Sequence, residues 1–161
     1  KFSMIGATVS CTTRPIRNWE KDGVDYHFVS NEKFEMLIRD NEFMEYVECY
    51  GNKYGTLKNS VIDILQTKRF CILDLEFDGA ANVLSGKYLN FNCVGILMLP
   101  PSVSALKIRL LGRGSETSES LQKRLADSFT VSRIANYRHV VVNLELQSTK
   151  IEIENIIQMY S

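Results

Sequence analysis

Three unbroken apolar runs constrain the fold of this chain more than any other feature. They lie at residues 70–73, 94–99 and 140–142, and each is closed by a polar residue or by proline. Runs without polar alternation are typical of parallel strands that are covered on both faces. Segments with helical character lie between them, and such alternation of strands and helices predicts an α/β fold built on a parallel sheet.

Local patterns in the first half of the chain predict smaller elements. An apolar start at residues 2–6 is expected to form a first strand. Ser30 is a suitable N-cap for a helix over residues 31–40. The aromatic-rich stretch 43–50, which a Gly-Asn pair follows, predicts a β-hairpin. Apolar residues at helical spacing predict a second helix over residues 57–67.

Helical patterns dominate the second half. Helices are expected over residues 78–84, 102–111 and 118–129, and Ser102 is a suitable N-cap for the second of these. A last helix is expected to begin near Thr149, because Glu152 completes a capping-box pattern three residues later. The side chains that this helix would turn toward the core are Ile153, Ile156, Ile157 and Tyr160.

The composition narrows the range of functions. The 161 residues include 19 basic and 19 acidic ones, and this zero formal charge argues against a partner such as duplex nucleic acid. No apolar run reaches the ~18 residues of a transmembrane helix, so we expect no membrane partner. The 4 cysteines show no C-x-x-C spacing, which predicts reduced thiols, no metal site in the protein and a cytoplasmic location.

Residues 10–28 combine hydroxyls, arginines and a tyrosine around a turn. Arg14 and Arg17 are close enough in sequence to converge on one anion, and Ser10 and Tyr26 add neutral donors. A guanidinium group fits a phosphate in a bidentate manner, so the pattern indicates a site for a phosphate monoester. The alternative is a basic loop whose arginines only form salt bridges with two nearby acids, Glu20 and Asp22.

Three carboxylates and two hydroxyl residues are candidates for further binding roles. Asp74 and Glu76 follow a buried run, where they could hold Mg²⁺ through water or orient a phosphate acceptor, or simply solvate the strand end. Glu45 could accept two adjacent donors such as guanine offers, or it is a surface charge on an edge strand. Tyr54 and Thr56 could complete a nucleotide pocket, or they are ordinary turn residues.

Three arginines in the second half flank a glycine-bracketed turn and a polar helix start. They are Arg109, Arg113 and Arg124. Glycine hinges beside arginines suit a lid that closes over a phosphate chain. The alternative is a solvated surface between two helices.

Taken together, these motifs resemble those of the guanylate kinases. The resemblance covers nearly the whole chain in order, and the arginine loop is its most specific part. The motifs that carry it are VSCTTRPIR at 9–17, DGVDYHFV at 22–29, EFME at 42–45, YGT at 54–56, CILD at 71–74 and the segment 100–124.

The resemblance implies a P-loop-kinase-like α/β fold. It has a three-layer parallel-sheet core, a small mixed α+β insertion that binds GMP, and a helical lid. The core would consist of residues 1–9, 68–108 and 128–161, the insertion of residues 10–67, and the lid of residues 109–127.

The resemblance also implies a reaction, the transfer of the ATP γ-phosphoryl group to GMP, with Mg²⁺ carried by ATP. GMP would be bound by Ser10, Arg14, Arg17, Tyr26, Glu45, Tyr54, Thr56, Asp74 and Glu76. ATP would be bound by Arg109, Arg113 and Asn143. Catalytic charge stabilisation would come from Arg14, Arg109, Arg113 and Arg124. The protein would be a monomer or a weak dimer.

One departure from the family pattern is large. The phosphate loop G-x-x-x-x-G-K-[ST], which would hold the ATP phosphates, is absent from the sequence. Gly6 resembles the first glycine of that loop, which suggests that a loop and a helix are missing between Ala7 and Thr8. The alternative function is a catalytically inactive guanylate-kinase-like interaction domain of a scaffold protein. Such domains tend to lose the GMP and lid arginines, which this chain keeps.

Overall fold

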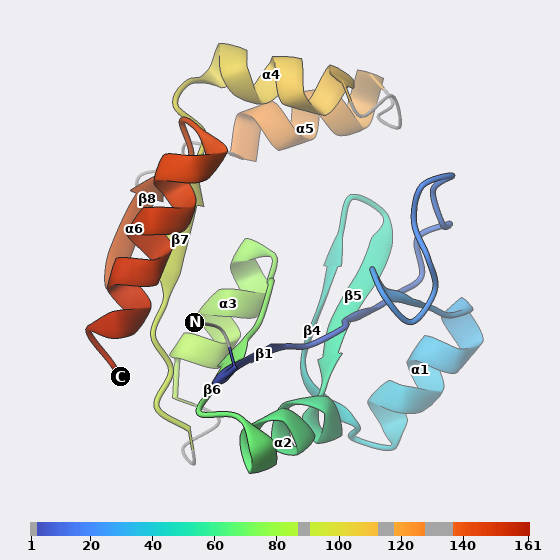
Figure 1. Cartoon of the computed structure of the whole chain (residues 1–161). Coiled ribbons are helices and arrows are strands. Elements are labelled where there is room, and N and C mark those ends of the chain that lie inside the picture. Colours follow the sequence, from blue (N-terminus) through green and yellow to red (C-terminus); the bar gives the residue numbers. More distant parts are fainter. Residues whose placement is uncertain (1–2, 87–90, 113–117, 128–136) are drawn as a thin grey trace. The chain divides into compact units, whose positions relative to one another are not determined.

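The structure, a computed structural model, describes residues 3–86, 91–112, 118–127 and 137–161 (Figure 1). The chain divides into two compact units, Lys1–Phe91 and Asn92–Ser161. All residues expected to bind GMP belong to the first unit, and those expected to bind ATP belong to the second. Residue 2 of the expected first strand, residues 128–129 of an expected helix, and Arg113 lie outside the described residues.

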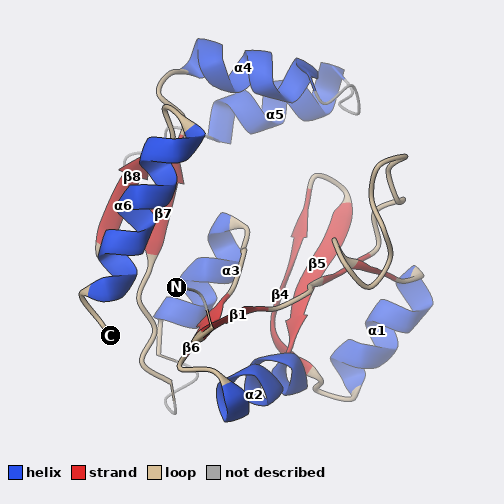
Figure 2. Ribbon diagram, viewed as in Figure 1, coloured by secondary structure: helices blue, strands red, loops and turns tan. Residues whose placement is uncertain are grey.

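A four-stranded sheet in the first unit carries Glu45, Tyr54 and Thr56, and its longest strands, β4 and β5, are the paired red arrows labelled in Figure 2. In spatial order its strands are β3 (His27–Phe28), β2 (Cys11–Thr12), β5 (Asn52–Leu57) and β4 (Phe43–Cys49). Strands β4 and β5 form the hairpin that the sequence predicts. Tyr50 and Gly51 make its turn with φ values of 52° and 76°, and glycine adopts this left-handed conformation without steric cost.

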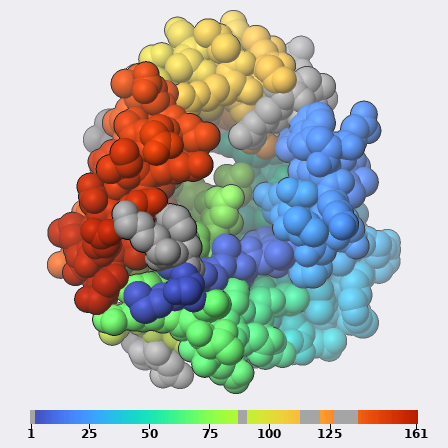
Figure 3. Space-filling view, in the orientation of Figure 1, coloured from blue at the N-terminus to red at the C-terminus, as the bar shows by residue number. Residues whose placement is uncertain are grey.

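A parallel pair of strands completes the sheet structure described in this unit. Strand β1 (Ile5–Ala7) pairs with β6 (Phe70–Ile72), which confirms a strand in each segment. Helix α2 (Lys58–Thr67) packs closely on β1, because a Cβ built on Gly6 would lie 2.5 Å from Ile64 Cγ2. The space-filling view shows the start of the chain, in dark blue, crossing the surface beside this helix (Figure 3).

Helix α1 (Asn31–Arg39) begins as the sequence predicts. The Lys33 N–H group donates to the Ser30 side chain at 3.2 Å, which satisfies a backbone donor that the helix itself cannot pair. Phe34 of this helix is fully buried and stacks on Phe43 at a ring-centroid distance of 4.5 Å.

A second apolar cluster joins β4 to helices α2 and α3 (Phe77–Leu84). Its buried members are Met44, Val61 and Val83. Phe43 and Met44 lie beside a shift in strand register between Phe43 and Glu45, and they belong to different clusters. Strand β4 therefore packs against both apolar clusters.

The described residues of the second unit form two parallel strands and three helices. These are β7 (Ile96–Leu99), α4 (Val103–Gly112), α5 (Ser118–Asp127), β8 (His139–Val142) and α6 (Leu146–Gln158). Strands β7 and β8 pair in parallel, which confirms strands in the other two apolar runs. The Ser102 side chain accepts the Ala105 N–H group at 3.1 Å, as expected of the residue that caps α4.

One face of β8 is covered by helix α6. Val141 is fully buried, and Ile156 of α6 is buried as well. Val140 and Val142 point to the other face and are 40% and 49% exposed. Within the described part of the second unit this run is therefore covered on one face, and its cover on the other face stays a prediction.

Helix α6 begins three residues earlier than the sequence predicts. It starts at Leu146, and Glu145 is its N-cap residue. The Thr149 side chain is buried and donates to Asn143 Oδ1 at 3.3 Å. The prediction of a capping box at Thr149 and Glu152 is therefore wrong, because Thr149 lies inside the helix and its hydroxyl donates to Asn143 in the preceding loop.

Candidate functional site

The loop that carries the first two arginines is anchored on strand β5. The Thr13 N–H group donates to the Lys53 carbonyl at 3.0 Å, and the Lys53 N–H group donates to Thr13 Oγ1 at 2.9 Å. The Thr12 hydroxyl donates to the same Lys53 carbonyl at 3.0 Å and accepts the Arg14 N–H group at 3.1 Å. The backbone is thus fixed at the point where Arg14 leaves the sheet.

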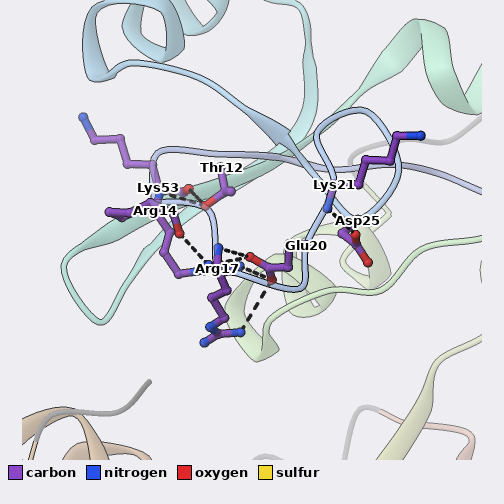
Figure 4. Close-up of polar contacts among 8 residues, drawn as sticks. Thr12, Arg14, Arg17, Glu20, Lys21, Asp25 and Lys53 are labelled. Atoms are coloured by element: carbon purple, nitrogen blue, oxygen red, sulfur yellow. Dashed lines mark hydrogen bonds and ion pairs between the residues drawn. The ribbon is translucent and has the colours of Figure 1, made fainter. Parts of the chain in front are cut away.

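Glu20 organises the rest of this loop (Figure 4). Its carboxylate accepts Arg14 Nη2 at 2.7 Å, Arg14 Nη1 at 3.0 Å and the Arg17 N–H group at 2.8 Å. Arg17 Nη1 lies 3.7 Å from Glu20 Oε1. The hydrogen bonds from Arg14 are the main reason why the pKa of Glu20 is lowered, and the same contact raises the pKa of Arg14.

From the sequence, Glu20 is expected to form a salt bridge in the alternative to a phosphate site. That salt bridge is present, but the same contact orients the two arginines expected to bind phosphate. The signal in the sequence is the position of an acid three residues after Arg17. Asp22, the other acid of that alternative, accepts the Phe28 N–H group at 2.9 Å and so holds the following turn.

Aromatic rings surround the Arg14 side chain. Its Cζ atom lies 5.5 Å from the Tyr26 ring centroid and 5.6 Å from that of Phe28. Tyr26 packs edge to face with Tyr54 at 6.1 Å, and Tyr54 also helps to raise the pKa of Arg14. The structure therefore brings Arg14, Tyr26 and Tyr54 together, as the phosphate-site hypothesis requires.

The two acids that follow β6 lie near this group. Burial raises the pKa of Tyr26, and the negative charges of Asp74 and Glu76 add to the effect. Glu76 is the N-cap residue of α3, although its side chain makes no capping hydrogen bond. Asp74 is exposed at the end of β6. Both acids are thus within electrostatic range of the tyrosine phenol expected to bind phosphate.

A buried chain of hydrogen bonds connects β4, β5 and the segment before β2. The Thr56 hydroxyl donates to Glu45 Oε1 at 2.8 Å, and Ser10 Oγ lies 3.4 Å from Thr56 Oγ1. Because the single Thr56 hydroxyl proton goes to the carboxylate, Ser10 is the donor of the second hydrogen bond. The chain therefore runs from Ser10 through Thr56 to Glu45.

Glu45 is only 5% exposed although β4 lies at the edge of its sheet. Burial raises the pKa of this carboxyl group, while hydrogen bonds from the side chain and backbone of Thr56 act in the opposite direction. A buried carboxylate is costly unless it is hydrogen-bonded. The surface-charge interpretation of Glu45 and the plain-turn interpretation of Thr56 are therefore wrong.

Two residues of the expected ATP site lie together in the second unit. Arg109 Nη2 donates to the Asn143 carbonyl at 2.8 Å and to the Leu144 carbonyl at 3.2 Å. Arg124 belongs to α5, which packs against the helix that carries Arg109. The contacts of Arg109 hold the loop between β8 and α6.

Among the described residues, no group of three or more His, Cys, Asp or Glu side chains could hold a metal ion. In the same part of the chain no helix is long and apolar enough to cross a membrane.

Comparisons with known proteins agree on one family. The sequence profile described as guanylate kinase matches residues 1–160. A guanylate kinase of Clostridioides difficile strain 630 is 38% identical over 154 residues, which cover 95% of this chain and 74% of that protein. A guanylate kinase of Symbiobacterium thermophilum is 40% identical over 151 residues, with 93% and 70% covered. The crystal structure of guanylate kinase from Anaplasma phagocytophilum matches with a TM-score of 0.78 and 27% identity, covering 99% of this chain and 77% of that chain.

Proposed function

Because the chain belongs to the guanylate kinase family, whose members have the P-loop kinase fold, we propose that it binds GMP in its first unit and accepts a phosphoryl group from ATP, giving GDP and ADP. The observation that carries the proposal is the pairing of an oriented arginine loop with a buried, hydrogen-bonded carboxylate in one unit. Mg²⁺ enters with ATP as part of the substrate. The alternative, an inactive interaction domain, gains no support from these findings.

The phosphate of GMP binds to the arginine loop in this proposal. Arg14 and Arg17 supply guanidinium groups, and Tyr26, Tyr54 and Ser10 supply hydroxyl donors. Support comes from the contacts of Glu20, which hold the arginines before any ligand arrives. A preformed site of this kind loses less conformational entropy when the anion binds.

The base of GMP is recognised by Glu45, with Thr56 beside it. Guanine presents two adjacent N–H donors, at N1 and at the exocyclic amine, which a carboxylate can accept, whereas adenine presents an acceptor at N1. Support comes from the burial of Glu45, because a desolvated carboxylate discriminates strongly against a ligand that leaves it unpaired. Asp74 and Glu76 contribute to the same side of the site.

Phosphoryl transfer in this proposal uses residues of the second unit. Arg109, Arg113 and Arg124 neutralise the charge of the transferring group together with Arg14, and Asn143 lies at the adenine. The sequence carries no phosphate-loop motif, so this half of the proposal rests on family membership and the GMP half rests on the contacts described above.

Four further expectations stay predictions. They are the division into core, GMP-binding insertion and lid, the missing segment between Ala7 and Thr8, the monomeric or weakly dimeric state, and the cytoplasmic location.

Calorimetric titration of the protein with GMP and with AMP tests the proposal. We expect saturable binding of GMP and at least tenfold weaker binding of AMP, as the loss of one hydrogen bond to a charged group costs about 1.5–3 kcal/mol. Formation of ADP and GDP from ATP and GMP is the second measurement. Equal affinity for the two nucleotides would contradict the role of Glu45, and binding without turnover would support the inactive alternative.

A further inference from the structure

Helix α3 packs against strand β4, and a glycine of the helix lies beside Glu45 of the strand. A Cβ atom built on Gly79 would lie 2.5 Å from Glu45 Oε2 and 3.3 Å from Glu45 Cδ. Real Cβ atoms essentially never lie as close to another atom as the shorter of these distances, so the flexible end of Glu45 would have to shift. The carboxylate of Glu45 therefore occupies a space that exists only because residue 79 has no side chain.

The opposite side of the carboxylate is also occupied. The Thr56 hydroxyl donates to Glu45 Oε1 at 2.8 Å, and Thr56 itself is fully buried. One carboxylate oxygen thus lies against Thr56 on strand β5, while the other lies against Gly79 on helix α3. The group cannot move toward the helix without a collision, or away from it without disturbing its bond to Thr56.

The backbone around this contact is fixed by packing. Val83 lies one turn after Gly79 on the same helix, and it is buried in a cluster with Met44 and Val61. Met44 is the neighbour of Glu45 in β4. Helix and strand are therefore held together beside the contact, so a side chain added at residue 79 would displace the end of Glu45 rather than the helix.

We propose that Gly79 is a positioning residue for base specificity, because the space at its Cα places the Glu45 carboxylate where it can accept the donors of guanine. The inference rests on the proposed role of Glu45. It adds that this role depends on a residue of a different element, which has no polar side chain and touches the base only through Glu45.

The variant Gly79→Ala tests the inference by calorimetric titration with GMP, IMP and AMP. IMP keeps the N1–H donor of GMP and lacks its exocyclic amine. We expect GMP to bind about tenfold more weakly, which is the value of one hydrogen bond to a charged group, with AMP unchanged. The ratio of GMP to IMP affinity should fall as well. Asn82→Ala, an exposed change on the same helix, is the matched control and should keep all three affinities.

A double variant shows whether the effect passes through the carboxylate. In a Glu45→Ala background the Cβ atom would keep only an ordinary contact with Val47 Cγ1 at 3.6 Å, so adding Gly79→Ala should change GMP affinity no further. An equal further loss in that background would overturn the inference. The single variant Glu45→Ala separates the role of Glu45 from that of Gly79. Unchanged selectivity for GMP over AMP in Glu45→Ala would overturn the proposed role of Glu45. If Glu45→Ala loses this selectivity but Gly79→Ala binds all three nucleotides like the wild type, only the role of Gly79 is overturned.

Thermal melting accompanies each titration, because a folding defect would imitate lost binding. We expect the Gly79→Ala protein to stay folded at the titration temperature. If it does not stay folded, Glu45→Asp tests whether the position of the carboxylate sets the selectivity. This variant shortens the side chain by one methylene and leaves α3 unchanged. Full retention of guanine selectivity by Glu45→Asp would overturn the inference.

Discussion

The Arg14 guanidinium is held by both carboxylate oxygens of Glu20, at 2.7 and 3.0 Å. The same carboxylate accepts the Arg17 N–H group at 2.8 Å, so one acid fixes a side chain and a turn of backbone together. Bidentate, charge-assisted pairs of this kind are geometrically specific. The loop is therefore oriented for an anion before any anion binds.

Removal of the charge at Glu20 should weaken phosphate binding and leave base recognition intact. We expect Glu20→Gln to bind GMP roughly tenfold more weakly, because one charge-assisted hydrogen bond is replaced by a neutral one. AMP affinity should fall by the same factor, so the GMP/AMP ratio stays constant in titration calorimetry. The control is Asp25→Asn, an acid-to-amide change in the same loop at a carboxylate that accepts the Lys21 N–H group at 2.7 Å. A changed GMP/AMP ratio would contradict this assignment of Glu20 to the phosphate.

The two arginines should differ in their effect on stability. Arg14→Ala leaves the Glu20 carboxylate, whose side chain is only 7% exposed, without its main partner, so we expect a loss of about 1–3 kcal/mol in the free energy of unfolding. Arg17→Ala removes a side chain 3.7 Å from that carboxylate and keeps the Arg17 N–H bond, so we expect a smaller loss. Both variants should bind GMP more weakly, and urea unfolding provides the stability comparison. A larger stability loss for Arg17→Ala would show that the Glu20 contact is not the one that holds the loop.

The carboxyl group of Glu45 should make stability depend on pH in a defined direction. Its pKa is raised in the folded protein, so the folded state binds the proton more readily than the unfolded state, and the wild type gains stability as the pH falls through the folded pKa. Glu45→Gln cannot titrate. We therefore expect the melting temperature of the variant relative to the wild type to be highest at pH 7 and to decrease toward pH 5, as measured by scanning fluorimetry.

Glu45→Gln should also relax the selectivity for guanine, because the amide nitrogen cannot accept a donor from the base. A variant that is stable at pH 7 but less selective for GMP over AMP would separate the binding role of Glu45 from any role in folding. A melting difference that stays constant from pH 7 to pH 5 would argue that the carboxyl group does not titrate with a raised pKa.

The hairpin turn should require a residue that tolerates a left-handed backbone. Gly51 has a φ of 76°, and a Cβ added there meets no atom within 4 Å, so backbone strain alone sets the cost. We expect Gly51→Ala to lower the free energy of unfolding by about 1–2 kcal/mol in urea titrations. Gly51→Asn should cost less, since asparagine visits this conformation more readily. Equal losses for the two variants would show that strain at this position is not the cause.

Local sequence patterns were enough to predict much of the fold. The positions of the strands at 70–73, 94–99 and 140–142 could be inferred from their own residues, and so could the hairpin of residues 43–57. The same is true of the helix that begins after Ser30. A run of apolar residues, a Gly-Asn pair or an N-cap hydroxyl acts within a few residues, so its consequence can be inferred without knowing the remainder of the chain.

The first turn of α6 shows where such local reasoning ends. Thr149 and Glu152 have the spacing of a capping box. Thr149 nevertheless lies inside α6, and its hydroxyl donates to Asn143 in the loop before the helix. The stronger competitor was a loop acceptor that becomes available only once β8 and α6 have packed. The burial of Glu45 on the edge strand could likewise not be predicted from the residues beside it in the sequence, because its contacts, Thr56 and Gly79, belong to β5 and α3.

By itself, the sequence determined which functional side chains this protein has and in which order its helices and strands follow. These include the arginine loop, a glutamate that could bind guanine, and an α/β framework in the pattern of guanylate kinases. Only the tertiary structure decided how those groups are used. Glu20 orients the arginines, and Glu45 is desolvated between Thr56 and Gly79. The physical reason is that desolvation and hydrogen-bond pairing depend on atoms that come close only when separate elements pack together.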